Sequence, residues 1–252
     1  MEIVIIGTGN TASVLGKKLS VAGHRIIQVF GRDSMKASEL AYELATESTN
    51  YWNVVAKDAD IYIIAVSDIA VEEVFKELNL SDKTVVHTAA SVSKEVLKEG
   101  SSHYGVFYPL QSLRKGLSYL PEIPIIIDAS DPQTLEELDF LAHTISDKVI
   151  EANDEQRLKL HLAAVICNNF VNHLYALTEQ FCKKEGLDFY VLLPLIKETA
   201  ARLDDSAPSL TQTGPAIRND KATMEKHLEL LNAYPELKKI YSLLSQSIYH
   251  SR

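Results

Sequence analysis

The sequence predicts an α/β protein, with a doubly wound, mostly parallel sheet followed by an all-α C-terminal domain. Up to Ile150, short runs of branched apolar residues alternate with helical segments, which is typical of a parallel sheet covered on both faces. After Ile150 the spacing of apolar residues becomes helical throughout. We therefore expect two domains, at 1–152 and 153–252.

The chain opens with a strand and a glycine-containing turn. Ile3–Ile6 is a run of four branched apolar residues, as in strands buried on both faces, and Gly7-Thr8-Gly9-Asn10-Thr11-Ala12 follows it. Glycines permit a tight turn and close approach of the backbone to a ligand. The start of the next helix offers unpaired N–H groups to a pyrophosphate. This G-x-G-x-x-A pattern in its strand-to-helix context predicts a dinucleotide site, against the alternative of an ordinary glycine-containing turn.

The end of the second strand, Arg25–Phe30, indicates which dinucleotide is bound. Sites for NAD place an acidic side chain there to hold the ribose 2′-hydroxyl, whereas here Gly31-Arg32-Asp33-Ser34 follows the strand. Arg32 with Ser34 suits a 2′-phosphate through charge-assisted hydrogen bonds, so NADP is favoured over NAD. Asp33 would repel that phosphate unless it points away or caps the next helix. The alternative is that Arg32 is a solvated loop residue.

The rest of the first half continues the alternation of strands and helices. The expected segments are a helix at Met35–Thr46, a short strand at Asn53–Val55, a strand at Ile61–Val66, a helix at Ile69–Leu78, a strand at Thr84–Thr88, a helix at Ser93–Lys98, strands at Gly105–Tyr108 and Pro124–Ile127, and a helix at Gln133–Thr144.

Ligands of such sheets bind at the carboxyl ends of the strands. The residues expected near the nicotinamide are Val66, Ser67, Asp68, Ala89 and Ser91. His87 lies within an apolar strand and is expected to be a core residue. The turn after Pro109 brings Gln111 into reach of a substrate, unless Pro109 simply ends its strand.

A helical pattern of over thirty residues runs from Asn153 to Gly186 and begins with a capping box of Asn153 and Gln156. At 1.5 Å per residue it is about 48 Å long. Apolar residues occur nearly all round its middle, which predicts burial on several faces. We expect a second copy of the chain to supply part of that contact, giving a homodimer through the C-terminal helices.

Polar residues interrupt the apolar middle of this helix. At 100° per residue, His161, Asn168 and Asn172 fall within about 20° of one line, and Asn169 lies beside them. One interpretation is a hydrogen-bonded network that joins helices. The functional interpretation is a stripe facing the cofactor, in which His161 exchanges a proton, Asn169 and Asn172 fix a carbonyl or imine, and Asn168 contacts the substrate.

The last third of the chain is predicted to be helical with one irregular stretch. Pro194 should kink a helix at Asp188–Leu203. In the irregular stretch 206–220, Arg218 suits an anionic group and Asp220 suits the cap of a helix at Lys221–Leu231, although a plain connection between helices is an alternative. A final helix runs from Pro235 to about Tyr249.

Composition excludes several other classes of protein. The net charge is −9 without any block of Lys or Arg, which argues against a nucleic-acid partner, and no apolar run is long enough for a membrane helix. No signal peptide is expected at the N-terminus. Cys167 and Cys182 lie about 22 Å apart on one predicted helix, beyond disulfide reach, and no metal-type Cys/His spacing occurs. A cytoplasmic location is therefore expected.

The chain resembles a bacterial family of Rossmann-fold candidate NADP oxidoreductases with a helical C-terminal domain of unknown function, within the 6-phosphogluconate-dehydrogenase-like superfamily. More distantly it is similar to pyrroline-5-carboxylate and ketopantoate reductases. The motifs that carry the resemblance are Gly7-Thr8-Gly9-Asn10, Gly31-Arg32-Asp33-Ser34, Tyr108-Pro109-Leu110-Gln111, His161-Leu162-Ala163-Ala164-Val165 with Asn169-Phe170, and Thr213-Gly214-Pro215-Ala216 with Arg218 and Asp220. The family commonly has His at the position of Tyr108 and Gly at that of Asn219. The resemblance implies the fold, NADP and a dimer more strongly than it implies a substrate.

We therefore expect an NADP(H)-dependent oxidoreductase that transfers hydride to or from a small carbonyl or imine substrate in the cleft between the two domains. The alternative is a dinucleotide-binding protein without turnover, such as a redox-sensing or interaction module.

Overall fold

The computed structural model describes residues 1–78 and 80–251. Their contacts divide the chain into two compact units, Met1–Asn168 and Asn169–Arg252. This division lies beyond the domain boundary predicted at 152/153, because the first helix after that boundary is hydrogen-bonded to the first unit through Arg157. The predicted domain limits stay a prediction.

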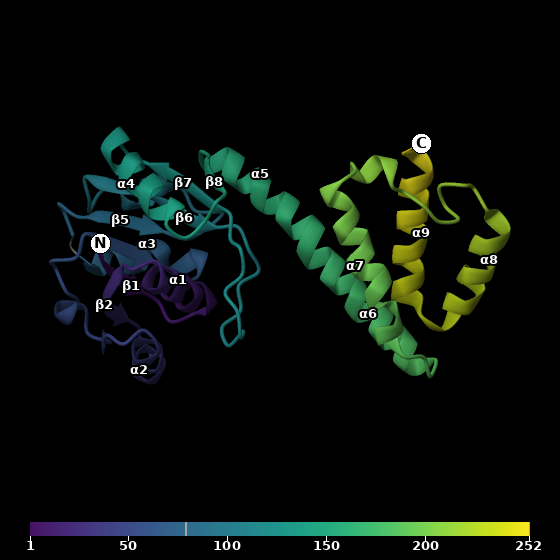
Figure 1. Cartoon of the computed structure of the whole chain (residues 1–252), viewed down its shortest axis with the longest axis horizontal. Coiled ribbons are helices and arrows are strands. Elements are labelled where there is room, and N and C mark those ends of the chain that lie inside the picture. Colours follow the sequence, from purple (N-terminus) through teal and green to yellow (C-terminus); the bar gives the residue numbers. More distant parts are fainter. Residues whose placement is uncertain (79, 252) are drawn as a thin grey trace. The chain divides into compact units, whose positions relative to one another are not determined.

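The first unit is built on one eight-stranded sheet (Figure 1). Its strands are β1 (Glu2–Ile6), β2 (Arg25–Phe30), β3 (Glu47–Thr49), β4 (Ile61–Ile64), β5 (Thr84–His87), β6 (His103–Pro109), β7 (Ile125–Ala129) and β8 (Val149–Glu151). The spatial order is β3-β2-β1-β4-β5-β6-β7-β8, and every neighbouring pair is parallel except β6 with β7. This order confirms the predicted doubly wound Rossmann sheet.

Helices cover both faces of this sheet because successive side chains of a strand point to opposite faces. Ile3 and Ile5 of β1 belong to the core under α1 (Asn10–Val21), α2 (Ser34–Glu43) and α4 (Pro132–His143). Val4 and Ile6 belong to the core under α3 (Val71–Leu78) and the short helix Lys94–Leu97. Each of these four strand residues is at most 1% exposed, which is why β1 is apolar from Ile3 to Ile6.

Two local predictions differ from the structure in the first unit, and one strand was not predicted. The segment predicted as a strand at Asn53–Val55 forms a 3₁₀ helix at Trp52–Val54, and the edge strand is β3 instead. The helix predicted at Ser93–Lys98 is a 3₁₀ helix, Lys94–Leu97, with Ser93 as its cap. The sheet also gains β8, whose three residues are too few to produce a periodic pattern in the sequence.

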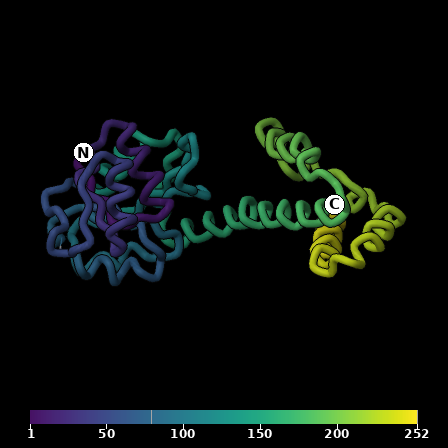
Figure 2. Tube along the Cα trace, turned by 90° about the horizontal axis from the view of Figure 1, so that it is seen from below, coloured from purple at the N-terminus to yellow at the C-terminus, as the bar shows by residue number. Residues whose placement is uncertain are grey.

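The second half of the chain is helical, as predicted, and its helices are coloured green to yellow in Figure 2. They are α5 (Asp154–Ala164), a π-helix (Val165–Phe170), α6 (Val171–Lys184), α7 (Leu193–Ala201), α8 (Lys221–Leu230) and α9 (Pro235–His250). The capping box of Asn153 and Gln156 is present at the start of α5. Gly186, with a φ of +68°, follows the end of α6.

Proline and Asp positions explain the remaining helix boundaries. Pro194 lies in the first turn of α7, so it begins a helix where we expected it to kink one. Phe189–Leu192 before it is a separate 3₁₀ turn. Asp220 caps α8 through the backbone N–H of Thr223, as predicted. No helix among residues 1–78 and 80–251 has both the length and the apolar character that crossing a membrane requires.

Candidate active site

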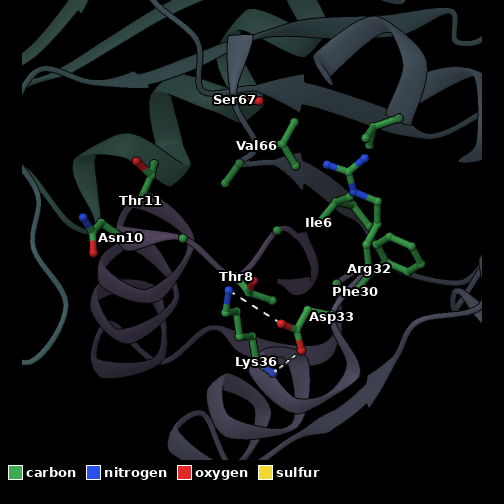
Figure 3. Close-up of a pocket in the computed structure, with 15 residues that line it drawn as sticks. Ile6, Thr8, Asn10, Thr11, Phe30, Arg32, Asp33, Lys36, Val66 and Ser67 are labelled. Carbon is green, nitrogen blue, oxygen red and sulfur yellow. Dashed lines mark hydrogen bonds and ion pairs between the residues drawn. The ribbon is translucent and has the colours of Figure 1, made fainter. Parts of the chain in front are cut away.

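A pocket lies at the carboxyl ends of β1, β2 and β4, where the order of the sheet reverses direction after β1 (Figure 3). Its volume is about 510 Å³. The residues that line it are Ile6, Gly7, Thr8, Gly9, Asn10, Thr11, Phe30, Gly31, Arg32, Asp33, Lys36, Ala65, Val66, Ser67 and Val74. Such a reversal is the point at which open α/β sheets bind ligands.

Three glycines shape this pocket: Gly7 and Gly31 allow neighbouring segments to pack closely, and Gly9 leaves space for a ligand. Gly7 has a φ of +132°, and a Cβ there would lie 2.1 Å from the carbonyl oxygen of Ala65. A Cβ on Gly31 would lie 2.5 Å from Cγ2 of Thr8. A Cβ on Gly9 would meet no atom within 4 Å, so Gly9 borders open space. The backbone of Gly9 is therefore accessible to a ligand.

The first turn of α1 faces that space without a side-chain cap. Gly9 is the N-cap residue and contributes no capping hydrogen bond, and the first turn contains no acidic residue. The N–H groups at this helix start therefore have neither a capping oxygen nor a competing carboxylate. An uncapped helix start beside an exposed glycine fits the pyrophosphate of a dinucleotide.

Three charged side chains surround the end of β2. The Asp33 carboxylate accepts hydrogen bonds from the backbone N–H groups of Met35 (3.1 Å) and Lys36 (3.2 Å), so it caps α2. The Lys36 backbone N–H is the main cause that holds the pKa of Asp33 below its usual range. Lys36 Nζ lies 3.6 Å from Asp33, and in Figure 3 the Arg32 side chain extends away from this pair.

Asp33 thus takes the helix-capping role that the sequence left open. Among the described residues, no carboxylate lies within ion-pair distance of the Arg32 guanidinium, which is exposed at the pocket. Lys36 supplies a second cation that the sequence analysis missed. Its position three residues after a helix cap is the signal that places it on the same side of α2 as the pocket.

Four residues predicted to bind the cofactor lie outside the set that lines this pocket: Ser34, Asp68, Ala89 and Ser91. Ser34 is the first residue of α2. Asp68 accepts hydrogen bonds from the hydroxyl and the backbone N–H of Ser91, which joins the segments that follow β4 and β5. Contact of Ser34 with the 2′-phosphate, and of Asp68, Ala89 and Ser91 with the nicotinamide, stays a prediction.

A second group of polar residues gathers in the first unit where β6 meets α5. The Tyr108 hydroxyl lies 3.0 Å from Nδ1 of His161, and the two rings meet edge to face at 73°. Burial is the main cause that raises the pKa of the Tyr108 phenol; the Asp68 carboxylate raises it further and the Arg157 guanidinium opposes both. The structure thus pairs the predicted catalytic histidine with a residue whose role the sequence left open.

Arg157 is fully buried one turn before His161 on α5. Its guanidinium donates to the carbonyl oxygens of Ala90 (3.1 Å) and Val92 (2.5 Å) and to the Asp154 carboxylate (2.8 Å). Sequence analysis missed this residue, because a charged side chain in an amphipathic pattern predicts the solvated face. The sequence did offer one sign: Arg157 lies four residues before His161, so both side chains lie on the same face of α5.

His87 lies in the core, as predicted, and its Nδ1 accepts the backbone N–H of Ala89 at 3.1 Å. Burial and the Arg157 guanidinium lower the pKa of His87 to about 4, so its ring is neutral at neutral pH.

The other predicted substrate and catalytic residues are placed as follows. Gln111 is exposed and bonds within its own loop, donating to the Glu122 carbonyl (3.0 Å) and accepting from the backbone of Ser112 (2.9 Å). Asn168 and Asn169 lie in the π-helix, Asn172 lies in α6, and Arg218 precedes α8; all four are exposed. Their roles stay predictions.

The π-helix corrects one step in the argument for those asparagines. The alignment of His161 with Asn168 and Asn172 assumed an uninterrupted α-helix at 100° per residue. A π-helix has i→i+5 hydrogen bonds and turns less per residue, so that alignment does not extend across Val165–Phe170. π-Bulges are frequent at functional sites, and this one contains two of the residues concerned.

The fold and the pocket define a dinucleotide-binding oxidoreductase of the Rossmann class, and comparison with known proteins supports this. Residues 2–91 match a family model described as "NADP oxidoreductase coenzyme F420-dependent". Residues 123–248 match a domain of unknown function, DUF2520. A solved structure of a candidate NADP oxidoreductase from Bacteroides fragilis is 41% identical, covers 99% of this chain and 98% of that chain, and has a TM-score of 0.91. The chain therefore belongs to this family of NADP oxidoreductases with a DUF2520 domain.

More distant solved structures share the fold. The 1-pyrroline-5-carboxylate reductase of Streptococcus pyogenes is 15% identical with a TM-score of 0.67, over 99% of this chain and 98% of that chain. The pyrroline carboxylate reductase of Plasmodium falciparum, solved with NADP bound, is 14% identical with a TM-score of 0.66, over 99% and 98%. No curated protein matches the chain.

Proposed function

We propose that this protein is an NADPH-dependent reductase of a small imine or carbonyl compound, with His161 as the proton donor. The observation that carries the proposal is the pocket at the switch point, with its uncapped helix start and its two cations, Arg32 and Lys36. When bound, NADPH supplies the hydride. The chain's own task is to orient the substrate and deliver a proton.

His161 supports this assignment because its Nδ1 is paired with Tyr108, while Nε2 has no hydrogen-bond partner among the described residues. Orientation of the substrate by Asn169 and Asn172, and binding of its polar end by Gln111, Asn168 or Arg218, belong to the same proposal. The distant pyrroline carboxylate reductases and the NADP bound to one of them support a substrate with a C=N or C=O group.

We also propose that the protein is a homodimer in the cytoplasm. The long helical stretch exposes large apolar side chains in the single chain: Leu162 is 58% exposed, Ile166 52% and Phe170 57%. Exposed apolar side chains on one helical stretch favour a protein partner, and a second copy supplies the same surface.

Cofactor binding tests the proposal first. Calorimetric titration of the protein should show NADPH binding more tightly than NADH. The double variant Arg32→Ala, Lys36→Ala should weaken NADPH binding by about 10²–10⁴-fold, since hydrogen bonds to charged groups contribute about 1.5–3 kcal/mol each, and should leave NADH binding unchanged. The control is Arg25→Ala at the opposite end of β2, where Arg25 is paired with Glu2.

Turnover tests it second. NADPH oxidation should be detected with members of a panel of cyclic imines, ketones and aldehydes. No binding of either dinucleotide would refute the whole proposal. Tight binding of NADPH without turnover of any panel member would instead favour a dinucleotide-binding sensor or interaction module.

A further inference from the structure

The contact between Tyr108 and His161 joins two elements that are far apart in the sequence. Tyr108 lies near the end of β6, and His161 lies in the last turn of α5. Tyr108 Oη and His161 Nδ1 are 3.0 Å apart, and the ring centroids are 6.1 Å apart. Each ring is partly buried, so the hydrogen bond is shielded from bulk water on part of its surface.

The position of His161 in this contact is set by the buried anchor one turn earlier. Arg157 fixes α5 to the segment after β5 through the carbonyl oxygens of Ala90 and Val92. Residues four apart lie on the same face of a helix, so the anchoring of Arg157 also directs His161 toward the end of the sheet. The Tyr108 contact is therefore built into the first unit.

The direction of the hydrogen bond depends on the tautomer of His161, because a protonated phenol can donate to Nδ1 or accept from Nδ1–H. Burial and the Asp68 carboxylate raise the pKa of Tyr108 against the opposing Arg157 cation, so its hydroxyl is protonated at neutral pH. His161 Nδ1 is the partner that the structure gives to this hydroxyl among the described residues. An O–H that donates to Nδ1 requires that nitrogen to be unprotonated, and a neutral imidazole in that arrangement carries its proton on Nε2.

We propose that Tyr108 is a positioning residue that holds His161 as the Nε2–H tautomer and relays its own hydroxyl proton to Nδ1 during reduction. The inference rests on the proposed function. As the substrate carbon accepts hydride from NADPH, the Nε2–H bond breaks and an O–H or N–H bond forms on the product. The Tyr108 O–H bond breaks at the same time and an Nδ1–H bond forms. The resulting phenolate lies in the field of the Arg157 cation. The starting state returns when Nε2 takes a proton from water and Nδ1 gives its proton back to the phenolate.

The tautomer can be measured without any substrate. Nitrogen-15 NMR of the histidine rings, with His161 assigned by comparison with His161→Gln, should show an unprotonated Nδ1 and a protonated Nε2 in the wild-type protein. Tyr108→Phe keeps the ring and removes the hydroxyl, so the spectrum should change to a mixture of both tautomers. An unchanged His161 spectrum in Tyr108→Phe would overturn the proposal.

The chain offers a matched control for that variant. His227 and Tyr241 form a second pair in the second unit, with Nδ1 and Oη 2.9 Å apart and the rings edge to face at 81°. Tyr241→Phe removes a hydroxyl from the same kind of pair and should leave the His161 spectrum as in the wild type. A change of the His161 tautomer in Tyr241→Phe would show that loss of any such hydroxyl perturbs the protein, and would also overturn the assignment.

Turnover distinguishes the relay from the proposed function. With NADPH and 1-pyrroline as the probe, Tyr108→Phe should lower kcat by about ten- to a hundredfold with KM nearly unchanged. This loss is smaller than the about 10²–10⁴-fold that a positioned proton donor contributes, because His161 itself remains. The solvent deuterium isotope effect on kcat should fall as one moving proton is lost. Equal kcat in the wild type and Tyr108→Phe would overturn the relay alone. Wild-type protein that reduces no probe would overturn the proposed function, and the NMR result would still decide the tautomer.

Discussion

Gly7 and Gly9 occupy the same turn but meet different constraints. Gly7 has a left-handed backbone and no room for a Cβ, because the Ala65 carbonyl lies 2.1 Å from where that atom would be. Gly9 has an ordinary φ of −79° and open space around it. The spacing of the two glycines predicted the turn, but only the tertiary packing of β4 against β1 distinguishes a structural glycine from one that keeps the pocket accessible.

Alanine at these two positions should therefore have opposite effects. Gly7→Ala should lower the free energy of unfolding by about 1–3 kcal/mol through backbone strain alone. The clash of the new Cβ with the Ala65 carbonyl should lower it further. Gly9→Ala should unfold at nearly the wild-type urea concentration and yet bind NADPH more weakly, because its methyl group enters the space beside the helix start. Urea denaturation and calorimetry measure the two effects. Equal stabilities of the two variants would contradict this assignment.

Lys36 and Arg157 show why single charged residues escape sequence analysis. Both occupy helical positions where a cation usually faces solvent, and the pattern offers no sign of what lies opposite. In the structure, Lys36 borders the pocket and Arg157 is fully buried against backbone carbonyls. What decides their roles is the position of neighbouring strand ends, which are distant in sequence.

At the scale of elements, α4 depends on a cap with several hydrogen bonds. The Asp131 carboxylate accepts hydrogen bonds from Thr134 N (2.9 Å), Thr134 Oγ1 (2.6 Å) and Ser130 Oγ (3.0 Å). Burial alone would raise the pKa of Asp131, but the hydrogen bonds from Thr134, Ser130 and His103 outweigh it and hold that pKa well below its usual range. The folded state thus favours the ionised carboxylate.

The stability contributed by Asp131 should therefore depend on pH. Because its pKa is lower in the folded than in the unfolded chain, the contribution is fully present above about pH 4, the unfolded value, and is lost as the pH falls further. Asp131→Ala should lower the free energy of unfolding at pH 7 by about 1 kcal/mol, as for other caps. Asp131→Asn keeps an acceptor and should show a weaker acid dependence. Urea denaturation between pH 3 and 7 measures the stability of both variants. An equal acid dependence of the wild type and Asp131→Asn would contradict the role given to the ionised Asp131 carboxylate.

Most elements follow from local patterns, and the exceptions have a common cause. The capping box at Asn153 and the cap at Asp220 involve residues three positions apart, so the sequence contains them completely. Asn219 has a φ of +57°, a left-handed conformation that asparagine tolerates. By contrast, the π-helix and the 3₁₀ segments at Trp52–Val54 and Lys94–Leu97 depend on what packs around them. Short irregular elements have no period of their own to detect.

For the whole molecule, the exposed apolar positions make the proposed dimer testable. Phe170→Asp should convert the dimer to single chains, because a charge replaces an apolar side chain in the contact that a second copy would cover. Tyr42→Asp is the control, since Tyr42 on α2 is 89% exposed and should tolerate the same change. Light scattering after gel filtration measures the mass. A wild-type protein with the mass of one chain would refute the dimer.

The sequence by itself determined the sheet, its dinucleotide turn and the helical second half, because strand burial, glycine spacing and helix capping are written in residues close together in the chain. Tertiary structure decided which residues meet: Tyr108 beside His161, and Arg157 beside the segment after β5. These contacts join residues on different strand ends and helix faces. Their geometry depends on how the whole sheet brings its carboxyl edge together, and no local pattern encodes that.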